Sequence, residues 1–459
     1  MPRRLATALP LACVVALTAC NKEQPSEPAI KAASSSPPSA SVVPKPPPRA
    51  ALPPLNVLLI SVDALRADGP WLGYPRNTAP NITRFSKQSV MYSHAYALSS
   101  YTSMSLGGLM AGRYPSELPR DGRATSSFLP EADFIAEHIK QAGLFSIGVH
   151  GHVYFLGDTG INQGFDAWKV FPRIVLNPAR EGAVVDPKLA DMLMEELGAH
   201  AKEKPDQRFF AWVHFMDPHF SYVRHPEQEP FKGNPYADGV EPIPPGTKLS
   251  DVGQGLRNQY DGEVLHTDAQ IGRLLDYVDK QPWGKHTAVV LTADHGEAFG
   301  EHKSYFEHGF LLYDVTTRVP LMLRVPGVKA RRIDTRRSHV DVAPTLLELM
   351  GVPTPEGLHG TSLVPELKGE TAPPQRDIVI DMPYTDQSPR RRALIHGDLK
   401  LIVTETDRQP LLFDLAKDPG EQQDLAGDEA RLAPMVKLYE RLQQATPDFA
   451  APRISKRQY

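Results

Sequence analysis

The chain has 459 residues, of which 23% are charged and 41% hydrophobic, and its formal net charge is −4. This length is enough for one large domain or two moderate domains with a buried core. The near-neutral charge excludes the strongly basic surface typical of nucleic-acid-binding proteins, so we expect no nucleic acid partner.

The first 20 residues have the pattern of a bacterial lipoprotein signal peptide. A basic start is followed by an apolar run at 5–19 that is too short to cross a membrane comfortably, and the sequence Leu-Thr-Ala-Cys at 17–20 resembles a lipobox. We therefore expect lipidation of Cys20, with an ordinary signal peptide or membrane anchor as the alternative. Asn21, rather than Asp, favours the outer membrane, so the predicted location is the cell envelope, in the periplasm or on the outer face.

Residues 21–54 are rich in Pro, Ser and Ala. Such a segment cannot bury a core and is predicted to be a partly extended tether. The only other cysteine, Cys13, lies within the signal peptide, so the mature chain can form no internal disulfide.

From residue 56 onward, buried strands alternate with amphipathic helices. Nearly continuous apolar runs predict strands at 56–62, 144–149, 209–215, 287–293 and 320–325. Apolar residues at helical spacing predict helices at 131–141 and 260–278. This alternation indicates an α/β fold with helices on both faces of a mostly parallel sheet.

Polar residues follow three of these strands. Asp63 comes after the first, His214 ends the segment at 209–215, and Asp294 and His295 follow the strand at 287–293. Ligands of open α/β sheets gather at the carboxyl ends of the strands. We therefore expect these side chains to contribute to one site.

The stretch at 99–115 combines a polar start with small apolar residues. Its hydroxyl residues can cap a short helix, and Gly112 can end it. A hydroxyl in the first turn of a helix lies where free N–H groups and the helix dipole favour an anion. The stretch therefore fits either a nucleophile that attacks a phosphate or sulfate ester, or a simple helix cap.

The stretch resembles the active-site signature of the sulfatase and alkaline-phosphatase-like superfamily, Thr/Cys-x-Pro-Ser-x-x-x-Leu-x-Thr-Gly. Thr102 falls at the nucleophile, Ser105 at the signature serine and Gly112 at the closing glycine, while Met104 and Leu106 stand where sulfatases have Pro and Arg. Sulfatases of the main class modify a Cys or Ser to formylglycine. Thr102 resembles instead the phospho-ester hydrolases and phospho-transferases of the superfamily, which use an unmodified Thr.

The resemblance also implies a metal site. Residues 56–68 and 291–297 resemble the two metal motifs of the superfamily, which makes Asp63, Thr102, Asp294 and His295 the expected ligands of one divalent ion. Ala64 and His295 replace an Asp and an Asn of many sulfatases, so Mn²⁺ or Zn²⁺ is favoured and Ca²⁺ is possible. A bound zinc lowers the pKa of water from about 15.7 to about 7, and a similar effect would make Thr102 an alkoxide.

Histidines complete the expected site. The segment at 212–219 matches the family's His-x-x-Asp-Pro-His, which implies substrate contacts by His214 and His219. His308 is the expected general acid, with bracing of the metal site as its alternative. His302 and His152 are further expected substrate contacts, the latter near the position of a lysine in sulfatases. The expected catalytic residues are thus Thr102, His308 and His219.

After about residue 375, short strands are predicted at 377–381, 393–396 and 399–404, followed by a helix at 428–444. The resemblance implies an alkaline-phosphatase-like sandwich with a large, mostly parallel sheet and a small C-terminal antiparallel subdomain. We expect a signal peptide at 1–20, a tether at 21–54, a catalytic domain at 55–372 and the C-terminal subdomain with its tail at 373–459.

The predicted function is metal-dependent hydrolysis or transfer of phosphate or sulfate esters, with phospho-esters favoured. The expected substrate is a small-molecule, lipid head-group or glycan ester, and the membrane is reached through Cys20. One alternative is an arylsulfatase-like sulfuric ester hydrolase, which would need Thr102 to act without formylglycine. A second alternative is an inactive lipoprotein that binds a glycan or partner on the envelope.

Overall fold

The computed structural model describes residues 52–123, 125, 127–173, 184–223, 225, 231–235, 247–302, 305–370 and 375–451. The chain divides into two compact units, 1–48 and 49–459, and every described residue belongs to the second. The expected signal peptide, Cys20 and nearly all of the expected tether lie outside the described residues, so the lipid anchor stays a prediction.

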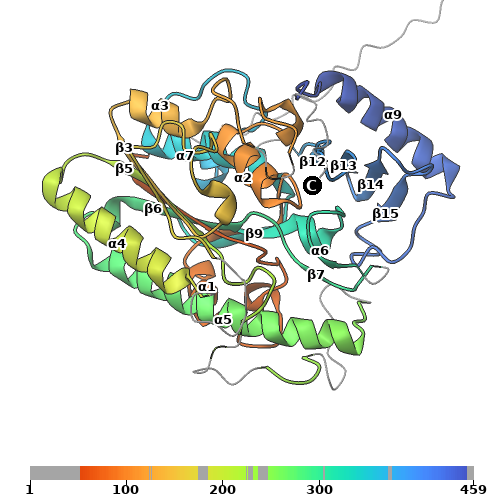
Figure 1. Ribbon diagram of the computed structural model, residues 1–459, viewed down its shortest axis with the longest axis horizontal. Helices are drawn as coiled ribbons and strands as arrows, with labels where there is room; N and C mark the ends of the chain where they lie inside the picture. Colours follow the sequence, from red (N-terminus) through yellow and green to blue (C-terminus); the bar gives the residue numbers. More distant parts are fainter. Residues whose placement is uncertain are drawn as a thin grey trace, which may run out of the picture. The chain divides into compact units, whose positions relative to one another are not determined.

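A large, mostly parallel sheet lies at the centre of the second unit (Figure 1). Its strands follow the order β10-β2-β9-β6-β1-β5-β3-β4, and β11 pairs with β2. Among the strand pairs that the described residues form in this sheet, only the pairs of β9 with β2 and with β6 are antiparallel. The strands are β1 Asn56–Val62, β2 Val90–Tyr96, β3 Phe145–His150, β4 Ala167–Val170, β5 Phe209–Phe215, β6 Thr287–Ala293, β9 Arg318–Arg324, β10 Arg331–Ile333 and β11 Arg337–Ser338.

Helices cover both faces of this sheet (Figure 1). One face carries α2 Thr102–Ala111, α3 Ile135–Gln141, α7 Val342–Met350 and the short α8 Val364–Leu367, and the other carries α1 Pro80–Ser86, α4 Asp186–Glu203 and α5 Asp251–Lys280. All seven residues of β1 are buried. Val57 and Leu59 pack into the first core, whereas Leu58 and Ile60 pack into the second, because alternate side chains of a strand point to opposite faces.

The C-terminal residues form a smaller, antiparallel sheet, drawn in blue in Figure 1. Its strands are β12 Ile378–Met382, β13 Arg391–His396, β14 Leu399–Thr404 and β15 Leu411–Asp414, and α9 Glu429–Ala445 follows them. Lys400 of β14 is fully buried and pairs with Asp314 of the short helix α6 Asp314–Thr317 at 2.7 Å and with Glu421 at 2.8 Å. This ion pair ties the small sheet to the main body.

The predicted fold class is confirmed, and the bounds of β1, β5, β6 and β14 agree with the predicted ranges. Helix α5 begins at Asp251, nine residues before the predicted start at residue 260. The Ser250 side chain caps the helix there by accepting the Gly253 N–H. Helix α3 starts later, because Phe134 has an extended backbone and forms its N-cap. Within the described part of the chain, we find no helix that combines the length and the apolarity needed to cross a membrane.

Candidate active site

The expected metal ligands converge at the ends of two adjacent strands. Asp63 follows β1, Asp294 and His295 follow β6, and the parallel pairing of β1 with β6 brings these ends side by side. The Nε2 atom of His295 lies 3.1 Å from Thr102 Oγ1, 3.2 Å from Asp294 Oδ2 and 3.7 Å from Asp63 Oδ1. We call Asp63, Thr102, Asp294 and His295 the metal cluster.

Thr102 is the first residue of α2 and is 2% exposed. The N-cap is Tyr101, and no side chain caps this helix, so the capping role that the hydroxyl residues suggested is wrong. Gly112 ends α2 as predicted, with a φ of +61° that favours glycine. The Ser105 hydroxyl donates to the Asp294 carbonyl at 2.6 Å, which fixes α2 to the loop after β6.

The atoms of the cluster fit a bound cation. His295 donates from Nδ1 to the Gly296 carbonyl at 3.0 Å, so a neutral imidazole keeps its lone pair on Nε2 and can ligate there. Asp63 Oδ1 and Asp294 Oδ2 are buried and have no hydrogen-bond partner within the described residues. Buried carboxylate oxygens without a donor are costly unless a cation binds them.

The pKa values support the same conclusion. Burial and the neighbouring Asp63 carboxylate raise the pKa of Asp294 to about 7. Asp63 is fully buried as well, but His219, His214 and His295 hold its pKa well below the usual value. Two buried carboxylates of one cluster can both be ionised at neutral pH only when a positive charge lies between them.

His214 lies behind Asp63 and is fully buried. Its Nε2 lies 3.3 Å from Asp63 Oδ2, and its Nδ1 lies 2.9 Å from the hydroxyl of Ser61, which also accepts the Trp212 indole N–H at 2.8 Å. Since both ring nitrogens are engaged, the position of His214 does not agree with the expected substrate contact. The residue orients Asp63 instead.

A second group of potential ligand atoms belongs to Asp63, His152 and His219. The Tyr154 N–H donates to His152 Nδ1 at 3.0 Å, so a neutral His152 carries its proton on Nε2, which lies 3.9 Å from Asp63 Oδ2. This tautomer makes Nε2 a hydrogen-bond donor and opposes metal ligation there. His219 Nδ1 contacts the Phe220 carbonyl, which leaves its Nε2 as an acceptor.

His308 lies over the metal cluster, with its ring stacked on His295 at a centroid distance of 4.2 Å and its centroid 4.8 Å from that of His219. Its Nδ1 lies 3.0 Å from Glu297 Oε1. Burial opposes the charged form, but the Glu297 carboxylate prevails and raises the pKa of His308 to about 9. Glu297 therefore favours the protonated form of His308, which a general acid requires.

Two other histidines lie apart from the cluster. His302 stacks on Tyr313 at 3.7 Å, and no contact between described residues joins it to the cluster, so its expected substrate contact does not agree with this geometry. His150 is enclosed by Trp168 and Trp212, whose centroids each lie 4.3 Å away, and its ring nitrogens have no partner among the described residues.

Sequence reasoning missed Arg173. This buried guanidinium donates to the carbonyls of Met216 at 3.2 Å, Asp217 at 3.1 Å, His219 at 2.5 Å and Ser221 at 2.8 Å. It therefore shapes the loop that presents His219. No recurring motif surrounds Arg173 in the sequence, and the carbonyls that it binds lie more than 40 residues away along the chain, so no sequence signal could have identified it.

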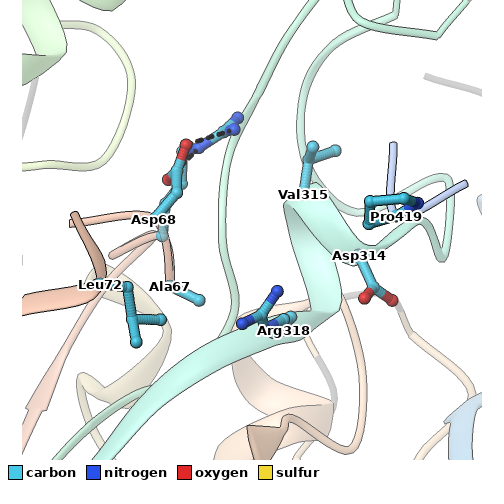
Figure 2. A pocket seen from close by; sticks show the side chains of 8 residues that line it. Ala67, Asp68, Leu72, Asp314, Val315, Arg318 and Pro419 are labelled. Carbon is cyan, nitrogen blue, oxygen red and sulfur yellow. Dashed lines mark hydrogen bonds and ion pairs between the residues drawn. The ribbon is translucent and has the colours of Figure 1, made fainter. Parts of the chain in front are cut away.

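A separate small cavity has a volume of about 30 Å³ and is lined by residues that include Arg66, Asp68, Leu72, Asp314 and Arg318. In Figure 2, Asp68 is paired with the guanidinium of Arg66, and Asp314 of α6 and Arg318 of β9 lie across the cavity from it. None of the lining residues belongs to the metal cluster. Its volume is about that of one water molecule, so it is no substrate site.

Comparison with known proteins identifies the family. Residues 55–352 match the Sulfatase family. This chain belongs to the sulfatase family. Residues 300–448 also match the C-terminal region of the N-sulphoglucosamine sulphohydrolases. As a member of the sulfatase family, the protein is an ester hydrolase, and the superfamily typically binds a divalent metal ion.

The relatives include a sulfatase and a protein of the alkaline phosphatase superfamily, and the solved structures with the same fold include a phosphonate monoester hydrolase. The choline-sulfatase of Rhizobium meliloti is 25% identical over 433 residues, which cover 81% of this chain and 82% of that protein. The multifunctional alkaline phosphatase superfamily protein PehA of Trinickia caryophylli is 31% identical over 201 residues, which cover 40% and 38%. The solved phosphonate monoester hydrolase of Agrobacterium radiobacter shares the fold, with a TM-score of 0.69 at 21% identity over 85% of this chain and 95% of that one.

Proposed function

We propose that this protein hydrolyses phosphate esters in a metal-dependent reaction with Thr102 as the nucleophile. The observation that carries the proposal is the position of the Thr102 hydroxyl, 3.1 Å from His295 Nε2 and in one cluster with two buried carboxylates. An unmodified threonine cannot supply the formylglycine on which the main class of sulfatases depends.

Asp63, Asp294, His295 and Thr102 would hold one divalent ion. Their mixed oxygen and nitrogen donors favour Mn²⁺ or Zn²⁺ over Ca²⁺. When bound, such an ion lowers the pKa of a hydroxyl and offsets the negative charge of the ester.

The side chains themselves carry the covalent steps. The Thr102 hydroxyl, whose pKa a bound ion would lower, would first release its proton to solvent. The resulting alkoxide attacks the phosphorus, so that an O–P bond forms to Thr102 and the bond to the leaving oxygen breaks. His308, charged beside Glu297, donates its Nε2 proton to that leaving oxygen. A water then attacks the phosphorus of the phospho-threonine and gives one proton to the now neutral His308. The bond between phosphorus and the Thr102 oxygen breaks, which restores the Thr102 alkoxide and releases phosphate or a phosphomonoester.

Two groups support binding of the non-bridging oxygens. The first turn of α2 has N–H groups without intrahelical acceptors, which favour an anion beside Thr102. His152 Nε2–H is a donor held on the Asp63 side of the cluster. His219, with Nε2 as an acceptor, suits a contact to a hydroxyl or to the attacking water.

Sulfate esters are the alternative substrates, and the similarity to a choline-sulfatase favours them. Two residues disfavour sulfate esters as substrates. Thr102 cannot become formylglycine, and Leu106, which replaces the arginine of sulfatases, is fully buried in the core. A lipoprotein that only binds its ligand is disfavoured by the complete metal cluster, which a purely binding protein does not need.

The test compares three substrates with one leaving group: 4-nitrophenyl phosphate, 4-nitrophenyl methyl phosphate and 4-nitrophenyl sulfate. We expect turnover of at least one phosphate ester, one Mn or Zn per chain by metal analysis, and loss of turnover by about 10³-fold or more in Thr102→Ala. Thr406→Ala, at an exposed position, is the matched control. Full turnover in Thr102→Ala would end the proposal, and turnover of the sulfate alone would make the protein a sulfuric ester hydrolase.

A further inference from the structure

Large apolar side chains are exposed on three loops that carry histidines of the site. Val153 is 43% exposed, Phe220 is 36% exposed and Phe310 is 52% exposed. Each lies within two residues of His152, His219 or His308 along the chain. Exposed apolar residues that gather beside polar catalytic groups are typical of ligand-binding surfaces.

Two tyrosines link these loops to the nucleophile. Tyr101 immediately precedes Thr102, and its ring stacks on that of Tyr154 with centroids 6.0 Å apart and hydroxyls 3.0 Å apart. Tyr154 in turn packs on His152 at 4.1 Å. A Cβ atom at Gly309 would lie 3.0 Å from the Tyr101 ring, so the loop of Phe310 contacts the same pair. We call Val153, Phe220, Phe310, Tyr101 and Tyr154 the apolar collar.

The loop segments around Val153, Phe220 and Phe310 contain no charged side chain other than His308. Residues 151–157, 219–223 and 308–312 contain no Lys, Arg, Asp or Glu, although these make up 23% of the chain. A substrate with several sulfate or phosphate groups requires cationic partners for each of them. These loops offer such a substrate only the histidines that already surround the cluster.

We propose that the apolar collar binds an alkyl or aryl group of the ester, so that the substrate is an amphiphile with one anionic head and one apolar group. This proposal rests on the proposed function, which identifies the anionic head as a phosphate ester. Contact with the collar would remove apolar surface of the substrate from water, which is favourable in proportion to its area.

The test measures binding rather than turnover. Methylphosphonate, hexylphosphonate and phenylphosphonate are titrated calorimetrically into the full-length protein loaded with Mn²⁺. We expect the hexyl or phenyl compound to bind about tenfold or more tightly than the methyl compound, because each buried methylene adds to the affinity. Tighter binding of hexyl than of phenyl identifies an alkyl chain as the natural group, and the reverse order identifies an aryl group.

Variants locate the effect. Phe310→Ser and Val153→Ser should each reduce the ratio of apolar to methyl affinity to about twofold or threefold. Val252→Ser is the matched control, since Val252 of α5 is 65% exposed and belongs to none of the three loops. Circular dichroism verifies that each variant is folded.

The outcomes separate this proposal from the proposed function. Equal affinities for the three phosphonates would overturn the collar proposal and leave phosphate-ester hydrolysis intact. If methanesulfonate and hexanesulfonate bind while no phosphonate binds, the preference for phospho-esters is wrong. In that case the collar proposal is tested by the affinity of hexanesulfonate relative to that of methanesulfonate: a ratio of about tenfold or more supports it, and equal affinities overturn it. Binding of neither series would overturn both proposals.

Discussion

His152, His295 and His308 each have one ring nitrogen engaged by a neighbour, and that contact determines what the other nitrogen can do. His295 donates from Nδ1, so its Nε2 keeps a lone pair and can bind a metal ion. His152 accepts at Nδ1, so its Nε2 carries the proton and is a hydrogen-bond donor. The charge on Glu297 makes His308 an acid. Three residues of one type thus acquire three different chemistries from their neighbours.

Asp294→Asn should have opposite effects on the metal-free and the metal-bound protein. Burial and Asp63 raise the pKa of Asp294 to about 7, so in the metal-free protein stability falls as pH rises toward 7 and stays low above it. Removal of this carboxylate should raise the unfolding free energy of EDTA-treated protein at pH 8 by about 2 kcal/mol, and it should weaken Mn²⁺ binding at least tenfold.

Thermal and urea unfolding at pH 8 measure the first effect, and metal titration measures the second. Asp206→Asn, at an exposed position, should change neither quantity. A metal-free Asp294→Asn protein that is less stable than the parent at pH 8 would contradict the proposed repulsion between the two carboxylates.

At the scale of elements, the loop after β5 depends on a residue from a different part of the chain. Four carbonyls of this loop converge on the Arg173 guanidinium, and Glu263 of α5 lies 3.8 Å from it. The planar guanidinium, with its five donors, can serve several acceptors at once.

Arg173→Ala should misplace His219 without disturbing the metal cluster. We expect kcat to fall by tenfold or more while the metal content stays at one ion per chain, because the Arg173 guanidinium holds the carbonyls of the His219 loop. Arg173→Lys should restore part of this loss, since an ammonium can reach some of the carbonyls.

Steady-state kinetics, metal analysis and thermal unfolding distinguish this positioning role from a general loss of stability. Arg273→Ala provides the control, because Arg273 forms an exposed pair with Asp191. If Arg173→Ala loses metal and kcat in parallel, Arg173 maintains the whole site rather than the His219 loop.

At the scale of the whole molecule, polar groups are buried against the strands of the large sheet as well as at its carboxyl edge. His339 is fully buried, and its Nε2 lies 2.8 Å from the Thr292 hydroxyl, which donates to the Pro320 carbonyl. Burial lowers the pKa of His339 to about 3. A proton on this ring would therefore strongly disfavour the folded state.

His339→Gln should make the protein less sensitive to acid. Because the pKa is lowered in the folded state, the contribution of neutral His339 is present above the ordinary pKa of 6.5 and is lost as pH falls toward 3. Between pH 6 and pH 4, its removal should reduce the slope of unfolding free energy against pH by about 1.4 kcal/mol per pH unit. Urea unfolding at several pH values measures the slope, with exposed His286→Gln as the control. An unchanged slope would show that His339 does not limit acid stability.

The strands, the strand-end residues and the stretch around Thr102 could all be predicted from the sequence. Apolar runs such as those of β1, β5 and β6 are local signals, because a strand buried on both faces must be apolar throughout. Asp63, Thr102, Asp294 and His295 were all named from their places along the chain, and the structure brings them together. The resemblance to the sulfatase superfamily, which the family match confirms, came from the same short stretches.

The partners of each polar side chain could be identified only in the folded structure. His214 and His302 looked like substrate contacts because a histidine near a strand end can point either way, and the fold engages the first with Ser61 and stacks the second on Tyr313. No local sequence pattern predicts the roles of Arg173 or of the apolar collar, because their partners come from distant segments of the chain. Hydrogen bonds, burial and charge act through space, so the roles of these residues follow from packing that no local pattern encodes.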